Sequence, residues 1–179
     1  PLALFVIYLS LPTYLTEHIT IIGGGPAGLM AAEVLSEAGL TVDVYDAMPS
    51  VGRKFLMAGK GGMNITHSET LADFLTRYGS RREHIEPLLQ AFPTDWLREW
   101  IQGLGIATFI GTSGRVFPTD MKAAPLLRAW LHRLREQGVR FHMRHRWTGW
   151  DDQGELRFTI PEGEIGIKAG NIAFHGQVK

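Results

Sequence analysis

The chain has 179 residues, of which 45% are hydrophobic and 20% are charged, and its 18 basic side chains balance its 18 acidic ones. This is the composition of an ordinary globular domain, and zero net charge gives no general attraction to nucleic acid or to an anionic membrane. Because cysteine is absent, disulfides, thiolate metal sites and thiol-based redox chemistry are excluded. We therefore expect a cytoplasmic protein with no nucleic-acid or membrane partner.

Residues 1–17 open with an apolar run, 2–11. This run is shorter than the about 20 residues that span a bilayer, and no basic segment precedes it as in a signal peptide. We interpret residues 1–17 as an N-terminal extension, either an extra strand or a segment foreign to the domain.

Residues 18–46 have the pattern strand, glycine turn, helix, strand. The apolar run 19–22 suits a strand that is buried on both faces of a parallel sheet. Gly23, Gly25 and Gly28 then fit G-x-G-x-x-G, in which the glycines permit a tight turn, close approach of a pyrophosphate and close helix packing. Pro26 suits the first helical position, so that the free amides around it face the phosphates.

A helix and a second strand complete this unit. We expect the inner helix face to hold Gly28, Ala31, Ala32, Leu35 and Ala38, and Gly39 to end the helix. The strand 41–45 ends in Asp46, close to the spacing of about 20 residues at which an acid binds ribose hydroxyls. The spacings therefore predict dinucleotide binding, and the alternative is that the glycines only shape a tight turn.

Residues 47–68 are rich in glycine and read as an ordered loop. Gly59, Gly61 and Gly62 would let the backbone approach a flat or charged ligand, and Arg53 and Lys54 could neutralise phosphates. The alternative is a flexible surface excursion whose cations are solvated.

The rest of the chain gives weaker signals. Periodicity predicts helices at 69–78, 82–92, 94–103 (capped by Thr94) and 120–137, strands at 106–110, 115–118 and 139–147, and a hairpin at 150–160. Pro125 requires the fourth helix to start near Ala123 or to kink. The seven histidines show no metal-ligand spacing and no partner nucleophile, so we expect no metal and no hydrolytic triad.

Three segments together resemble a known family: GGGPAGLMAAE (23–33), GRKFLMAGKGGMNIT (52–66) and GRVFPTDMKAAPLLRAWL (114–131). They resemble FAD-dependent flavoproteins of the BaiN/RdsA type, also known as the aminoacetone oxidase family, over about residues 16–150. The resemblance implies an α/β, Rossmann-like FAD-binding domain of the glutathione-reductase type, with a parallel sheet, a helical insertion and a β-meander. An insertion explains the long stretch between Asp46 and Val139.

The resemblance also implies roles for individual residues. The FAD pyrophosphate would be held by Gly23, Gly25, Pro26, Ala27 and Gly28, and the adenosine ribose would bind Asp46 and Ala47. Arg53 and Lys54 would contact the neighbouring phosphate or the ribityl chain. The isoalloxazine would lie near Gly61, Gly62, Met63 and Asn64, and adenine would contact the backbone at Trp147. For Arg115 and Lys122, tying the insertion to the domain is as good an interpretation as a flavin or substrate contact. No catalytic acid or base is implied.

We divide the chain into the extension 1–17, an FAD-binding domain at 18–163 with an insertion at about 47–118, and a divergent tail at 164–179. The tail does not resemble the next strand of the family, whose members continue for roughly as long again, so we expect a fragment of a longer enzyme. The implied function is the FAD-binding part of a flavoprotein oxidoreductase that transfers hydride through flavin, with NAD(P)H as donor and an unknown small-molecule substrate. The alternatives are a nucleotide-binding module without turnover and an NAD-dependent dehydrogenase.

Overall fold

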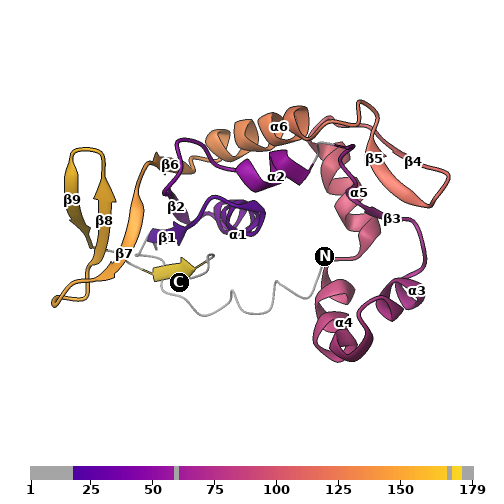
Figure 1. The fold of residues 1–179 in the computed structure, drawn as a ribbon, viewed down its shortest axis with the longest axis horizontal. Helices are drawn as coiled ribbons and strands as arrows, with labels where there is room; N and C mark the ends of the chain where they lie inside the picture. Colours follow the sequence, from indigo (N-terminus) through magenta and orange to yellow (C-terminus); the bar gives the residue numbers. More distant parts are fainter. Residues whose placement is uncertain (1–17, 59–60, 169–170, 175–179) are drawn as a thin grey trace.

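The computed structural model describes residues 18–58, 61–168 and 171–174, so the predictions for residues 1–17 and for Gly59 lie outside it. Its elements follow one another as shown in Figure 1: β1 (His18–Ile22), α1 (Pro26–Glu37), β2 (Thr41–Asp46), α2 (Arg53–Ala58), β3 (Thr66–His67), α3 (Leu71–Thr76), a 3₁₀ turn (Gly79–Arg81), α4 (Arg82–Ala91), α5 (Thr94–Gly103), β4 (Thr108–Ile110), β5 (Arg115–Pro118), α6 (Ala123–Glu136), β6 (Arg140–Met143), β7 (Arg146–Trp150), β8 (Leu156–Ile160), β9 (Gly163–Ile167) and β10 (Asn171–Phe174).

A parallel sheet organises the domain, with strand order β10-β1-β2-β6. Ile21 pairs with Val44 of β2 on one side and with Ala173 of β10 on the other. The crossover from β1 through α1 to β2 is the expected βαβ unit, so the Rossmann-like α/β fold is confirmed.

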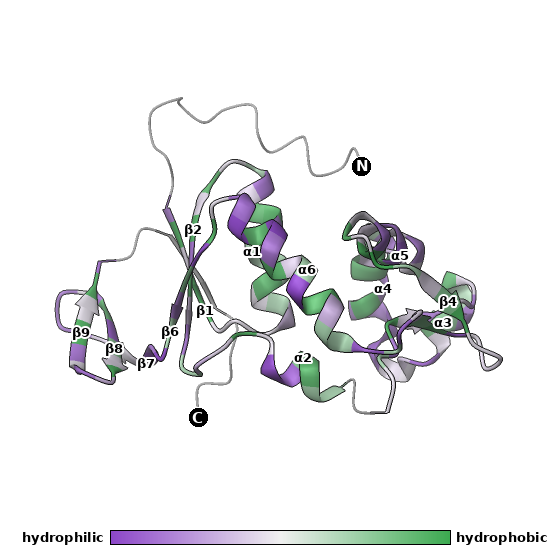
Figure 2. Ribbon diagram, turned by 90° about the horizontal axis from the view of Figure 1, so that it is seen from above, coloured by the Kyte–Doolittle hydropathy of each residue, from purple (hydrophilic) through white to green (hydrophobic). Residues whose placement is uncertain are grey.

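The sheet lies between two layers, as Figure 2 shows: α1 and α6 on one face, and the antiparallel sheet β7-β8-β9 on the other. On the helix side, Ile21 and Val44 pack with Leu29 of α1 and Leu134 of α6. On the other side Tyr45 packs with two buried side chains of β8, Leu156 and Phe158. Each such side chain contributes about 1.5–3 kcal/mol when it leaves water.

Helix α1 begins with Pro26 at its first position, and Gly39 follows it with φ +84°, both as predicted. Its inner face is rotated slightly from the expected one. Gly28 and Ala32 are buried, but Leu29 and Glu33 are buried with them, whereas Ala38 is the exposed C-cap residue. The prediction for Ala38 was wrong because a residue at the end of a helix leaves the packed layer even when its spacing fits.

The loop predicted at 47–68 contains two elements that the sequence did not indicate, α2 and β3. In α2 every residue is exposed except Phe55, which lies 6.2 Å from Trp130 between ring centroids. A six-residue helix with one inward side chain has no periodic signal, so it could not be predicted from the sequence.

The strand predicted at 139–147 is two strands, β6 and β7, in different sheets. Arg144 has φ +60° at the break, and its amide donates to the Met48 carbonyl at 3.1 Å. The next amide, of His145, donates to the Asp46 carbonyl at 2.9 Å. The apolar alternation continues through the break, and contacts distant in sequence turn the chain there.

The helical insertion follows the predictions closely. Helices α3, α4 and α5 occupy the three expected ranges, and β5 pairs antiparallel with both β4 and β3. Pro93, not Thr94, is the N-cap of α5, which corrects that prediction by one residue. Helix α6 starts at Ala123, so Pro125 lies in its first turn without a kink.

The tail contributes strands to the parallel sheet and to the β7-β8-β9 sheet. Strand β9 pairs with β8, and β10 is the fourth parallel strand, beside β1. The sequence indicates only weak strands from residue 164 onward and no resemblance to the next strand of the family after about residue 161. Strand β10 corrects the second point, since it joins the parallel sheet; four residues between glycines give only a weak strand pattern. The division at 163 stays a prediction. Within the described residues, the structure holds no helix with the length and apolar character that a bilayer crossing requires.

Candidate functional site

Three connections meet at the carboxyl edge of the parallel sheet: the glycine turn after β1, the segment after β2, and the break after β6. In open α/β sheets, ligands bind in the crevice outside this edge. The main candidate site is therefore the place where Gly23–Gly28, Asp46 and His145 come together.

The glycine turn has the geometry that its motif requires. Gly23 has φ +102°, and its amide donates to the Tyr45 carbonyl at 2.8 Å. Gly25 is the N-cap of α1. A Cβ added at Gly28 would lie 2.0 Å from the Gly23 carbonyl oxygen, which no side chain tolerates. Gly28 is thus required for the close packing of α1 on β1.

The Asp46 carboxylate faces this turn. Its Oδ2 accepts a hydrogen bond from the Gly24 amide at 2.7 Å, and its Oδ1 accepts one from the Met48 amide at 2.7 Å. Each carboxylate oxygen has a second acceptor site. The acid is therefore held beside the turn and retains the capacity to accept ribose hydroxyls.

The start of α1 is open to solvent, because Pro26 and Ala27 are exposed. The first amides of a helix have no intrahelical acceptor, and together with the helix dipole they favour an anion. The glycines of the turn have no side chains that could shield this backbone. These features fit the pyrophosphate of FAD.

The two predicted cations follow a segment that is fixed to the turn. The Gly52 amide donates to the Gly24 carbonyl at 2.8 Å, and Val51, only 3% exposed, would lie 2.1 Å from a Cβ at Gly24. Arg53 and Lys54 come next, both exposed, in the first turn of α2. Sequence reasoning missed Val51, since one buried valine in a polar stretch gives no pattern.

The predicted residues 61–64 are instead hydrogen-bonded to residues 66, 116 and 121. The Met63 amide donates to the Met121 carbonyl at 3.0 Å, and Asn64 Nδ2 donates to the carbonyls of Thr66 and Val116 at 2.8 and 3.2 Å. The second and third sequence motifs are thereby joined. No described hydrogen bond links Gly61, Gly62, Met63 or Asn64 to the glycine turn, and their place near the isoalloxazine stays a prediction.

Trp147 lies in β7, where it pairs with Phe158 of β8. The backbone that contacts Asp46 after β6 belongs to His145. Ala47 is half-buried next to the acid. The resemblance places adenine near the backbone of residues 145–147; the structure brings the amide of His145 to Asp46 at this edge, and the adenine role of His145 and Trp147 stays a prediction.

A buried carboxylate, Asp43, lies on the β7–β9 side of the sheet. Arg140 Nη2 donates to its Oδ2 at 2.5 Å, and His18 and His142 contact the same carboxylate. Burial raises the pKa of the Asp43 carboxyl, but hydrogen bonds from Arg140, His142 and His18 outweigh burial and leave that pKa below its ordinary value. Sequence reasoning missed this cluster, which an acid at an interior position of a buried strand could have indicated.

A second buried carboxylate joins three helices. Glu33 of α1 accepts hydrogen bonds from Trp100 Nε1 of α5 at 3.0 Å, from Trp130 Nε1 of α6 at 2.6 Å and from Arg133 Nη1 at 2.8 Å. Burying a charge is costly unless it is paired in this way. Glu33 therefore fixes the insertion and α6 to the helix of the glycine turn.

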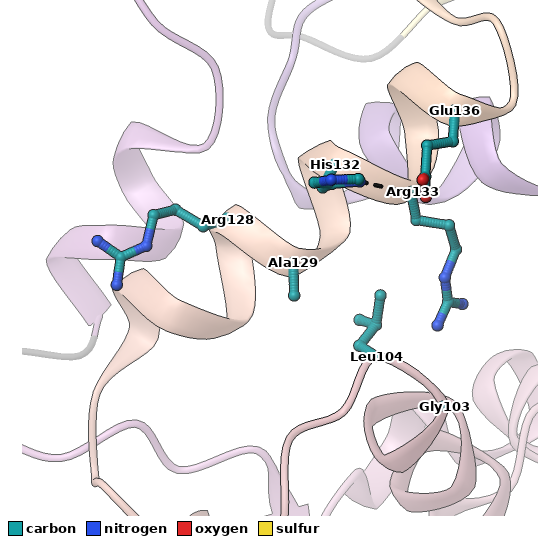
Figure 3. A pocket seen from close by; sticks show the side chains of 7 residues that line it. All are labelled: Gly103, Leu104, Arg128, Ala129, His132, Arg133 and Glu136. Carbon is teal, nitrogen blue, oxygen red and sulfur yellow. Dashed lines mark ion pairs between the residues drawn. The ribbon is translucent and has the colours of Figure 1, made fainter.

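A hollow of about 460 Å³ lies between the end of α5 and α6, and none of its lining residues belongs to the glycine turn (Figure 3). Arg128 and Arg133 point in different directions in it, and His132 pairs with Glu136 at 3.1 Å. Arg133 is bound to Glu33. The charged side chains that line the hollow do not converge on one point, so we do not assign a ligand to the hollow. The described residues also contain no group of three or more histidine or acidic side chains arranged to hold a metal ion.

The fold and the glycine turn define a Rossmann-type domain that binds a dinucleotide. More specifically, the chain matches the HI0933-like protein Rossmann domain over residues 17–176, and it belongs to this family of FAD-dependent oxidoreductases of the BaiN/RdsA type. FAD is the cofactor of the family. The resemblance drawn from the three motifs is thus confirmed.

Individual relatives agree with this family. The chain is 38% identical over 81 residues to a ribosomal RNA dihydrouridine synthase of Haemophilus influenzae. The aligned segment covers 45% of this chain and 19% of the relative. It is 34% identical over 74 residues to a thiamine thiazole synthase of Methanosarcina mazei, covering 41% of this chain and 28% of that protein. The chain thus matches less than a third of either relative.

Solved structures show the same fold. A 3-ketosteroid-Δ4-(5α)-dehydrogenase of Rhodococcus jostii superposes with a TM-score of 0.63 at 14% identity, over 90% of this chain and 46% of that one. At this identity the likeness concerns the fold alone.

Proposed function

We propose that this chain is the FAD-binding portion of a flavin-dependent oxidoreductase, and that the edge formed by the glycine turn and Asp46 binds the ADP half of the cofactor. The observation that carries this assignment is the Asp46 carboxylate held 2.7 Å from the Gly24 amide, beside the exposed start of α1. When bound, FAD supplies hydride transfer; the protein binds and orients it.

Each group at this edge has a distinct task. The amides of Ala27 and Gly28 would donate to the pyrophosphate, and Asp46 would accept from the ribose hydroxyls. The same carboxylate would repel a 2′-phosphate, which favours FAD over an NADP-type ligand. Arg53 and Lys54 would neutralise the second phosphate, Gly61–Asn64 would lie near the isoalloxazine, and the backbone near Trp147 would meet adenine.

The absorbance spectrum of the purified intact protein tests this proposal. Flavin bands should be present, and denaturation should release FAD. Release of NAD, or of no cofactor, would refute the FAD assignment.

We further propose NAD(P)H as electron donor, a small-molecule substrate and a cytoplasmic protein with no membrane contact.

A module that binds FAD without turnover is the second candidate. Among the described residues of the site we assign no catalytic acid or base, which is compatible with this candidate. FAD affinity without reductase or oxidase activity would distinguish it from an enzyme. An NAD-dependent dehydrogenase is disfavoured by the long insertion between β2 and β6.

The Haemophilus relative suggests a third test. Its name states that it makes dihydrouridine in ribosomal RNA, and saturating a uridine double bond is a reduction for which a flavin is suited. We nevertheless propose no nucleic-acid contact for this portion, because its net charge is zero. RNA binding that weakens steeply with salt would contradict this.

A further inference from the structure

We infer that Trp130 is a positioning residue for the phosphate site: it sets the distance between the start of α1 and the cations of α2. This inference rests on the proposed function. Trp130 is 2% exposed and contacts both sides of that site, because its indole N–H donates to Glu33 of α1 and its ring packs against Phe55 of α2.

Within helix α2, the inward support comes from Phe55. Of its six residues, Arg53, Lys54 and the last three are exposed, and Phe55 alone turns inward. The rings of Phe55 and Trp130 meet edge to face, with centroids 6.2 Å apart and planes at 65°. An exposed helix of six residues is unstable by itself, so this contact contributes to the position and orientation of its cations.

The segment before α2 is held by the same helix. A Cβ at Gly52 would lie 2.6 Å from Leu127 Cδ2, so α6 packs directly on the Gly52 backbone. Gly52 in turn donates its amide to Gly24 in the glycine turn. Leu127 and Trp130 are therefore two successive supports on one face of α6.

On the α1 side, Trp130 is held by its hydrogen bond to the charged carboxylate of Glu33. Trp130 Nε1 lies 2.6 Å from Glu33 Oε2, and Arg133 and Trp100 complete the hydrogen bonds of that carboxylate. Glu33 lies seven residues after Pro26, about 10.5 Å along a straight helix. A rigid link thus runs from α1 through Trp130 to Arg53 and Lys54.

Trp100 provides a matched control. Its indole also donates to Glu33, and its ring lies 4.8 Å from that of Trp130, but it has no described contact with α2. Trp130→Leu and Trp100→Leu therefore each remove one indole N–H from the same carboxylate. Only Trp130→Leu also removes the support of Phe55.

The experiment is calorimetric titration of the chain and its variants with ADP, at about 50 mM and about 500 mM salt. We expect Trp130→Leu to weaken ADP binding about tenfold at low salt and to flatten its salt dependence, because displaced cations no longer face the phosphates. Trp100→Leu should lose stability but keep ADP affinity within about twofold. Should Trp130→Leu not fold, Phe55→Leu removes the same contact from the other side.

A double variant, Arg53→Ala with Lys54→Ala, defines the full contribution of the cations. Adding Trp130→Leu to it should lower the affinity no further. If Trp130→Leu and Phe55→Leu bind ADP as the wild type does, with the same salt dependence, the inference is wrong while the proposed function stands. If the wild-type chain does not bind ADP at all, the proposed function fails and the inference falls with it.

Discussion

The amide of Gly24 donates to the Asp46 carboxylate at 2.7 Å, which joins the glycine turn after β1 to the acid after β2. Because Gly24 also accepts from the Gly52 amide, the turn, the acid and the start of α2 form one hydrogen-bonded unit. Each of its parts can be altered separately.

Gly28→Ala tests the packing of the turn. A methyl group would lie 2.0 Å from the Gly23 carbonyl oxygen, so the backbone must move. We expect the free energy of unfolding to fall by about 2–4 kcal/mol, and FAD binding to be lost as well. Gly103→Ala is the control, since its nearest contact would be at 3.5 Å. Urea unfolding of both variants measures the difference, and equal stability would contradict the geometry.

Asp46→Asn tests the acid. An asparagine has one acceptor oxygen where the carboxylate has two, so one of the Gly24 and Met48 hydrogen bonds is lost, and we expect FAD affinity to fall about tenfold. Asp151→Asn, in the turn between β7 and β8, is a control for loss of a carboxylate charge outside the glycine turn: both backbone amides there bond to Oδ1, which asparagine keeps, so FAD affinity should not change. Equal loss of FAD affinity in both variants would show that the effect is not specific to Asp46.

These parts differ in how far the sequence predicts them. The unit β1-α1-β2 follows from local signals: three glycines, a proline and an acid at fixed spacings. Helix α2 and the break at Arg144 do not, because Trp130 fixes the first, and the carbonyls of Asp46 and Met48 fix the second, from distant positions in the chain. Residues 61–64 were recognised as a motif, but their attachment to β5 depends on pairing between strands.

Asp43 should make stability depend on pH. Its folded pKa lies below the unfolded value of 3.8, so its contribution is complete above about pH 5 and is lost progressively as the pH falls through 3.8 and then the folded pKa. We expect Asp43→Asn to cost about 2–4 kcal/mol at pH 7, and up to about 1 kcal/mol less at pH 3. Urea unfolding at both pH values measures this. Glu164→Gln, which breaks an exposed pair with Arg157, should show a far smaller change; a cost for Asp43→Asn that does not vary with pH would rule out the assignment.

Arg133→Met tests the buried charge of Glu33. Without Arg133, its cationic partner among the described residues, the carboxylate stays buried with two indole donors, and we expect a loss of about 3–5 kcal/mol in unfolding free energy. Arg128→Met, an exposed change on the same helix, should cost less than about 0.5 kcal/mol. Thermal unfolding of the pair measures the contrast, and similar melting temperatures would mean that Arg133 is not needed there.

The most direct measurement is calorimetric titration of the wild-type chain with FAD, ADP and FMN. FMN carries the flavin without the ADP half, so the account predicts that FAD and ADP each saturate one site, and that FMN does not bind at the same concentrations. Binding of FMN as tight as that of FAD, or no binding of ADP, would contradict the claim that the glycine turn and Asp46 hold the ADP half of the cofactor.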